Sequence, residues 1–219
     1  MARRKQREAP EIVKERIERA AIELFARRGS GAVSVAQIAS AVGMSAQAVL
    51  YHYGTKAALH DAVTARILAV TASWLERFGS PDSLEVSVEG LTRLLVSFGT
   101  DNPWVPIVIL RELLSSPDVA QPRFQEETLG WRTRIAEALE AGKQLGIVRP
   151  DLDAQRWFDR VALMLLGTLS FPFREYPLSP DDEAAMTADL KEAVRIGLTS
   201  VFVTPDPWLD GRGFEQLVG

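Results

Sequence analysis

Cysteine is absent from this 219-residue chain, and histidine occurs only twice. Without cysteine there is no disulfide framework and no metal site built on thiolates, a composition that fits a reducing cytoplasm. The two histidines, His52 and His60, leave little material for metal-dependent or nucleophilic catalysis. A glycine-rich phosphate loop is also missing. We therefore expect neither an enzyme nor a bound metal or cofactor.

Long hydrophobic runs are lacking as well. No uncharged apolar stretch approaches the roughly 18 residues that suggest a membrane span. The basic stretch at residues 1–7 is not followed by an apolar core, so no secretory signal is expected. These absences predict a cytoplasmic protein with no membrane partner.

Apolar residues recur at three- and four-residue spacing along most of the chain, and this periodicity predicts an all-α fold. Glycine and proline separate the periodic segments. We expect three parts: a small helical domain at 1–54, a larger helical domain at 55–204 and a tail at 205–219. About nine helices are predicted, at residues 13–25, 34–42, 45–53, 55–78, 84–98, 104–114, 124–145, 153–171 and 181–201.

Charge is distributed unevenly between the predicted parts. Residues 1–60 contain ten basic and five acidic residues, a net charge of +5, whereas the remainder contains fifteen and twenty-four, a net charge of −9. The total is −4. A basic end on an acidic body is typical of a module that binds an anion such as nucleic acid.

A helix-turn-helix is indicated in the basic part. Ala39 is small enough for two helices to cross closely, and Gly43, four residues later, tolerates the positive φ of a tight turn. Ile38, Val42 and Val49 are spaced to hold both helices against the core. Ser45 caps the second helix, which is the one that enters the major groove of DNA in this motif.

The second helix carries polar and small residues on the side away from Val49. Gln47 lies there, and a glutamine amide can form two hydrogen bonds with adenine, so we expect Gln47 to read bases. Ala46 and Ala48 are small enough to approach the bases or to touch a thymine methyl group.

Phosphate contacts are expected around this base-reading helix. Tyr51 and His52 are placed for phosphates, although His52 serves equally well as a hydrogen-bonding residue within its own domain. Lys56 begins the next helix and adds charge there. The basic residues at 3–7 form either a DNA-binding arm or a solvated tail. The predicted DNA-binding residues are Arg3, Arg4, Lys5, Ser34, Ser45, Ala46, Gln47, Ala48, Tyr51, His52 and Lys56.

Residues 16–59 resemble the DNA-binding domain of the TetR family of bacterial repressors. The resemblance implies that Tyr51, His52 and Lys56 lie at the DNA backbone. Family members often have tyrosine where this chain has Leu50, so one phosphate contact is missing. The matching residues are Arg16-Ile17, Ala20-Ala21, Leu24-Phe25, Gly29, Val35-Ala36-Gln37-Ile38-Ala39, Gly43-Met44-Ser45, Val49, Tyr51-His52-Tyr53 and Thr55-Lys56-Ala57-Ala58-Leu59.

The resemblance also implies a helical C-terminal domain that binds a small-molecule effector and forms a homodimer through its last two long helices. The protein binds a palindromic duplex DNA operator in one of two states. A ligand that binds the other state better causes the DNA to be released, and the helix at 55–78 transmits the movement. Predicted effector-binding residues are Trp74, Phe98, Trp104, Arg111, Trp131 and Phe171. Predicted dimer residues are Leu163, Gly167, Leu190, Val194, Gly197, Leu198 and Val201.

Three alternatives stay open at this stage. The aromatic residues and the last two helices also suit an ordinary internal core. A protein-binding adaptor on the same fold is supported by Leu50 in place of tyrosine. An activator is as compatible with the sequence as a repressor.

Overall fold

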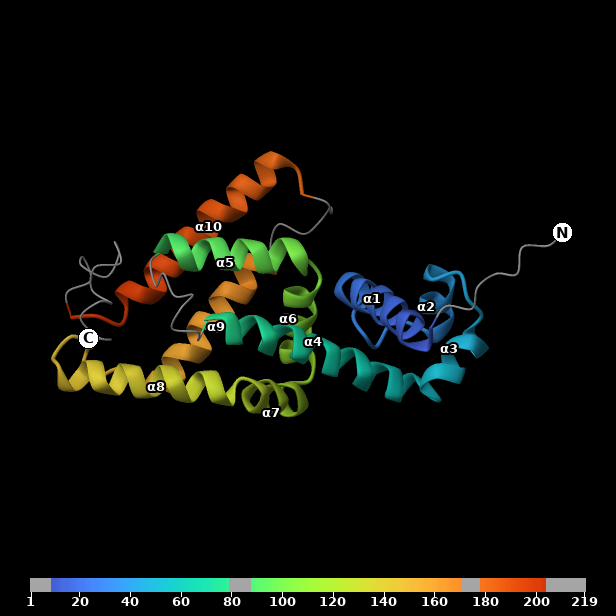
Figure 1. The fold of residues 1–219 in the computed structure, drawn as a ribbon, viewed down its shortest axis with the longest axis horizontal. Coiled ribbons are helices and arrows are strands. Elements are labelled where there is room, and N and C mark those ends of the chain that lie inside the picture. Colours follow the sequence, from blue (N-terminus) through green and yellow to red (C-terminus); the bar gives the residue numbers. More distant parts are fainter. Residues whose placement is uncertain (1–8, 79–87, 171–177, 204–219) are drawn as a thin grey trace. The chain divides into compact units, whose positions relative to one another are not determined.

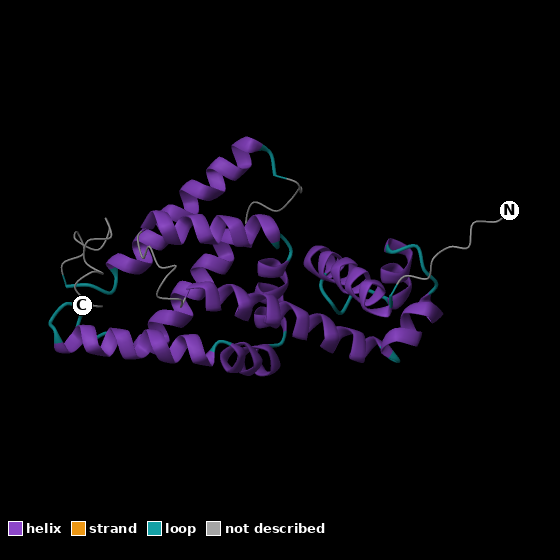
Figure 2. Cartoon of the chain, in the orientation of Figure 1, coloured by secondary structure: helices purple, strands orange, loops and turns teal. Residues whose placement is uncertain are grey.

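The computed structural model describes residues 9–78, 88–170 and 178–203. Within these ranges the chain forms ten α-helices and no β-strand (Figures 1 and 2). The all-α class expected from the sequence is confirmed. None of the helices in these ranges is long and apolar enough to cross a membrane. In chain order they are α1 (Pro10–Arg28), α2 (Val35–Ala41), α3 (Ala46–Tyr53), α4 (Lys56–Phe78), α5 (Val88–Asp101), α6 (Val105–Ser115), α7 (Pro117–Glu127), α8 (Leu129–Gln144), α9 (Ala154–Ser170) and α10 (Pro180–Thr199).

The prediction of nine helices was wrong at residues 117–145, where two helices replace the one expected at 124–145. Helix α7 begins at Pro117, because a proline in the first turn needs no hydrogen-bond partner for its missing N–H. The helix ends at Glu127, and the N–H and hydroxyl of the following Thr128 both donate to the Phe124 carbonyl, at 3.1 Å and 2.7 Å. Helix α8 then starts at once, with Arg132 N–H donating to the Thr128 carbonyl at 2.9 Å.

Internal contacts divide the chain into two compact units, and the division falls between Leu68 and Ala69, inside α4. The sequence places the domain boundary at residue 55, one residue before α4 begins. The first part of α4 contacts α1: the rings of His60 and Phe25 are centred 5.7 Å apart, and Arg66 forms ion pairs with α1.

In the first unit, α1 provides the apolar stripe on which the short helices pack. Its buried residues are Ile17, Ala21, Ile22, Phe25 and Ala26, spaced by one, three or four positions as one face of a helix requires. Helix α2 packs against both α1 and α3. Helix α1 is followed directly by Gly29, whose φ of 81° is rarely adopted by residues with a side chain.

In the second unit, α9 lies against α6, α8 and α10, and α10 also packs on α5 (Figure 1). Phe158, Leu166 and Leu169 are the buried residues of α9. An isolated antiparallel bridge between Val148 and Phe202 ties the segment after α8 to the end of α10. Val148 and Phe202 are both buried there, so this bridge belongs to the core of the second unit.

Candidate nucleic-acid interface

Both short helices of the predicted helix-turn-helix begin at capped N-termini. The Ser34 hydroxyl accepts from the Gln37 N–H at 3.3 Å, and the Gln37 side chain accepts from the Ser34 N–H at 2.8 Å. This reciprocal capping box satisfies two N–H groups that α2 itself leaves unpaired. Ser45 caps α3 by accepting from the Ala48 N–H at 3.1 Å. The caps therefore fix where each helix starts.

The turn between α2 and α3 has the geometry that the sequence predicts. Gly43 has a φ of 68°, in the left-handed region that favours glycine. Ala39 is buried, and its carbonyl accepts from the Met44 N–H at 2.8 Å. Ile38 and Val49 are fully buried, which confirms that they hold the two helices to the core, whereas Val42 is half-buried.

Helix α3 exposes one face and is anchored through the other. Val49 is buried, whereas Gln47 is exposed and Tyr51 is 87% exposed, a high value for an aromatic side chain. Gln47 and Tyr51 are four residues apart and therefore neighbours on the helix surface. The rings of Tyr51 and His52 are centred 5.7 Å apart in an edge-on arrangement. Ala46, Ala48 and Leu50 are half-buried.

Lys56 lies at the start of α4, next to its cap. The Thr55 hydroxyl accepts from the Ala58 N–H at 3.0 Å. The exposed Lys56 ammonium donates to the Gly31 carbonyl at 3.3 Å, in the loop before α2. This contact places a positive charge near the N-terminus of α2, which is also the positive end of the helix dipole.

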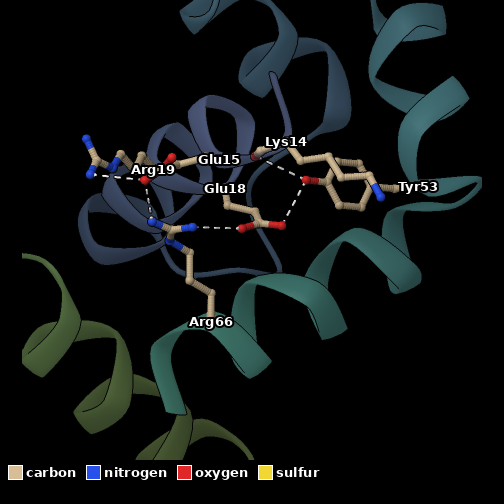
Figure 3. A network of polar contacts seen from close by, with 6 residues as sticks. All are labelled: Lys14, Glu15, Glu18, Arg19, Tyr53 and Arg66. Atoms are coloured by element: carbon tan, nitrogen blue, oxygen red, sulfur yellow. Dashed lines mark hydrogen bonds and ion pairs between the residues drawn. The ribbon is translucent and has the colours of Figure 1, made fainter. Parts of the chain in front are cut away.

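A polar network joins α1, α3 and α4, and the sequence analysis did not identify it (Figure 3). The Tyr53 hydroxyl lies 3.0 Å from Glu18 Oε1 and 3.2 Å from the Lys14 carbonyl oxygen. Arg66 donates to Glu18 Oε2 at 3.3 Å and to Glu15 Oε1 at 2.9 Å. Burial first, and then Glu18, raise the pKa of Tyr53 above its ordinary value, so this phenol remains a hydrogen-bond donor.

One signal for this network was present in the sequence. Arg66 lies three and seven residues after Val63 and Leu59, which are buried, so it occupies a position on the apolar stripe of α4. A charged residue at such a position needs a partner. The pattern did not show which residue on another helix provides that partner.

Some predicted residues lie outside the described residues, namely Arg3, Arg4 and Lys5 of the N-terminal arm and Phe171 of the effector set. Their predicted roles stay predictions.

The described members of the predicted effector-binding set are distributed over α4, α5, α6 with the residue before it, and α8. The Trp74 ring lies 4.8 Å from Phe98, and Trp131 lies 5.0 Å from Phe158, which is in turn covered by the Arg132 guanidinium at 4.5 Å. Trp104 is half-buried just before α6, and the Arg111 side chain is exposed on that helix. The fold therefore brings Trp74 and Phe98, two residues of the predicted set, into contact.

The predicted dimer residues divide between the core and the surface. Leu190, Val194, Gly197 and Val201 are buried within a single chain, because α10 packs on α5 and α9. A Cβ at Gly197 would meet Val161 of α9 at 3.4 Å, so this glycine allows close packing inside the chain.

Four other residues of α9 and α10 are at least partly accessible to a partner. Leu163 on α9 is 48% exposed, and Ile196 on α10, which was not predicted, is 47% exposed. Gly167 faces open space, and Leu198 is half-buried. The surface that α9 and α10 offer to a partner therefore differs from the predicted set.

Comparison with known proteins gives the family of the DNA-binding unit. The sequence profile described as "Bacterial regulatory proteins, tetR family" matches residues 17–63, which contain the helix-turn-helix. No curated protein sequence matches the chain.

Solved structures share the whole fold at low sequence identity. A TetR family transcriptional regulator from Chloroflexus aurantiacus has a TM-score of 0.64 at 16% identity, over 90% of this chain and 96% of that one. The ketosteroid transcriptional regulator KstR2 of Mycobacterium tuberculosis has a TM-score of 0.61 at 16% identity, over 91% and 98%. SmeT, the repressor of the SmeDEF multidrug efflux pump of Stenotrophomonas maltophilia, has a TM-score of 0.57 at 19% identity, over 88% and 93%.

The profile match and the shared fold agree with the capped α2 and α3, the glycine turn and the exposed face of α3. Residues 17–63 thus form a helix-turn-helix unit of the TetR family of bacterial regulatory proteins, and the chain as a whole shares its fold with solved transcriptional regulators.

Proposed function

We propose that the protein is a cytoplasmic repressor that binds a palindromic operator as a homodimer and is released by a small-molecule effector. The observation that carries the DNA-binding part is the exposed face of α3. Val49 and Tyr53 anchor the helix to α1 and its neighbours, while Gln47 and Tyr51 point away from the core. Residues that a fold leaves exposed on a capped helix are those that can enter a groove.

Base reading and phosphate binding are assigned to different residues. Gln47 is exposed near the N-terminus of α3, the end that contacts base edges in this motif. Lys56 is held by the Gly31 carbonyl at the edge of α2, where its charge serves phosphate binding. His52 and Tyr51 lie beside each other at the C-terminal end of α3, and we assign to them contacts with the phosphates of the DNA backbone on that side of the helix.

The test is the salt dependence of binding to duplex fragments selected from the genome that encodes the chain. The logarithm of affinity should fall linearly with the logarithm of salt concentration. Lys56→Gln should weaken binding to all sequences alike and reduce that slope by about 2, since a dimer loses about one phosphate contact per protomer. Gln47→Ala should relax base preference and leave the slope unchanged, and Gln121→Ala, at an exposed glutamine of α7, is the matched control.

If Gln47→Ala leaves the preferred sequence unchanged, the base-reading assignment is wrong. If the wild-type protein shows no salt-dependent binding to any duplex, DNA recognition itself is wrong and the adaptor alternative replaces it. The genes next to the selected fragments separate a repressor from an activator.

A homodimer is supported by the surface of α9 and α10. Leu163 and Gly167 are four residues apart and share a face of α9 where a single chain leaves open space at the glycine. Ile196 adds an exposed apolar side chain on α10. Two identical apolar faces of this kind can pack as a four-helix contact, and two recognition helices then bind two half-sites.

The effector proposal rests on the family and on the paired aromatics of the second unit. Trp74 lies on α4, beyond the boundary at Leu68, and its ring packs against Phe98 of α5. A ligand that binds near this pair can shift α4 if it favours one of two states, and full switching needs a ratio of affinities of about ten-thousand-fold. Repeating the genomic selection with candidate compounds tests this, because an effector must release the selected fragments.

A further inference from the structure

Glu18 of α1 connects two other helices of the DNA-binding unit through a single carboxylate. Its Oε1 accepts from the Tyr53 hydroxyl of α3 at 3.0 Å, and its Oε2 accepts from Arg66 of α4 at 3.3 Å (Figure 3). Each oxygen therefore serves a different helix. Any change in the position of Arg66 relative to α1 acts on the group that also holds the end of α3.

Glu15 of the same helix offers a natural comparison. It also accepts from Arg66, at 2.9 Å, and pairs with Arg19 of its own helix at 3.2 Å. Its side chain is 45% exposed, whereas that of Glu18 is 15% exposed. Glu18 accepts from both Arg66 of α4 and Tyr53 of α3, so the connection from α4 to α3 passes through Glu18.

At one end of this connection, Tyr53 lies on the recognition helix itself. Tyr53 is the last residue of α3, and Gln47 lies six residues before it, about 9 Å along the helix axis. Because α3 is only about 12 Å long, a shift of about 1 Å at Tyr53 tilts the helix by about 5°. Bidentate base contacts depend on hydrogen-bond geometry and tolerate little such change.

At the other end of the connection, Arg66 lies on α4 close to the end of the first unit. It lies two residues before Leu68, where the first unit ends, and it is the last charged residue of α4 within that unit. A helix movement that reaches the first unit along α4 therefore passes Arg66.

We propose that Glu18 of α1 is a positioning residue. It sets the orientation of the recognition helix α3 through Tyr53, in response to the position of Arg66 on α4. The proposal rests on the proposed DNA-binding function. It assigns to Glu18 no contact with DNA. It predicts that removing the carboxylate lowers specific operator affinity more than nonspecific affinity, because nonspecific binding depends on charge and not on the exact placement of Gln47.

The experiment compares Glu18→Gln with Glu15→Gln in the full-length protein. Both substitutions are isosteric, both remove one negative charge and both remove one partner of Arg66. Operator fragments from the selection and a scrambled duplex of equal length are the two probes, measured at one salt concentration. We expect Glu18→Gln to reduce the ratio of specific to nonspecific affinity about tenfold, while Glu15→Gln changes it less than about twofold.

A cycle with Arg66→Gln tests whether α4 acts through the same carboxylate. If the two residues share one connection, the double variant Glu18→Gln, Arg66→Gln should lose no more specificity than Glu18→Gln alone. Circular dichroism melting of each variant shows whether the first unit is folded at the assay temperature, and Tyr53→Phe, which removes only the hydroxyl, replaces Glu18→Gln if that variant unfolds.

Equal specificity ratios for Glu18→Gln and Glu15→Gln would overturn the positioning role, as would additive losses in the cycle. Both results differ from failure of the proposed function, in which the wild-type protein itself fails to distinguish the operator from the scrambled duplex.

Discussion

Gly43→Ala tests whether the turn between α2 and α3 depends on backbone conformation. Gly43 has a φ of 68°, and a Cβ built there would meet nothing within 4 Å. The substitution therefore introduces no clash, and its effect comes from the left-handed conformation, which costs about 1–2 kcal/mol for a residue with a side chain. Gly31→Ala is the matched control, because its Cβ also has open space and its φ is not positive.

The two variants share the same change in the unfolded chain, which loses freedom when alanine replaces glycine. That term should stabilise Gly31→Ala by about 0.4–1 kcal/mol. In Gly43→Ala the left-handed strain opposes it, so the two variants should differ in free energy of unfolding by about 1–2 kcal/mol. The difference isolates the conformational term.

The assay must report on the first unit alone. All five tryptophans, at positions 74, 104, 131, 157 and 208, follow Leu68 in the sequence, so tryptophan fluorescence does not report on α1–α3. Hydrogen exchange of the α2 and α3 amides measures the local opening free energy directly. Equal exchange free energies in the two variants would refute the argument from positive φ, and the tryptophan transition should be unchanged in both.

Two further predictions follow from polar groups of known burial. Because the raised pKa of Tyr53 means that the folded protein favours the neutral phenol, its contribution to stability is present below the unfolded pKa of 10.0 and is lost as the pH rises above it. The difference in unfolding free energy between wild type and Tyr53→Phe should therefore be smaller at about pH 11 than at about pH 8. Asp159→Asn should destabilise the second unit by about 1–2 kcal/mol in tryptophan-detected unfolding, because it removes the counter-ion of Arg132, which is 6% exposed. Glu89→Gln is the control, because it breaks an ion pair of the same 2.6 Å length with Lys191 in which both side chains are 55% exposed. It should lower the free energy of unfolding by less than about 0.5 kcal/mol. Equal losses in the two variants would contradict the role of burial.

The local features of the DNA-binding unit were predictable because each depends on residues close in sequence. The cap at Ser45, the positive φ at Gly43 and the burial of Val49 follow from residue type and spacing alone. The extra break at Thr128 was not predictable from periodicity, since Thr128 leaves the helical conformation (φ −95°, ψ 1°) while its N–H and hydroxyl both still donate to the Phe124 carbonyl.

Contacts between distant residues were less predictable. Glu18, Tyr53 and Arg66 come together only when three helices pack, and one sequence does not show which charges face each other. The predicted dimer residues show the same limit. Leu190 and Val194 have the apolar spacing of an interface, but α10 uses that face against α5 and α9 in its own chain.

Footprinting of the selected duplex tests DNA recognition by paired copies of α3 most directly. The account predicts two symmetric protected half-sites whose centres are about 10 base pairs, or a multiple of that, apart. It also predicts that Gln47→Ala abolishes the preference for the bases within those half-sites while protection of the backbone persists at low salt. A single protected half-site would contradict the dimer, and an unchanged base preference in Gln47→Ala would contradict the reading of DNA by the exposed face of α3.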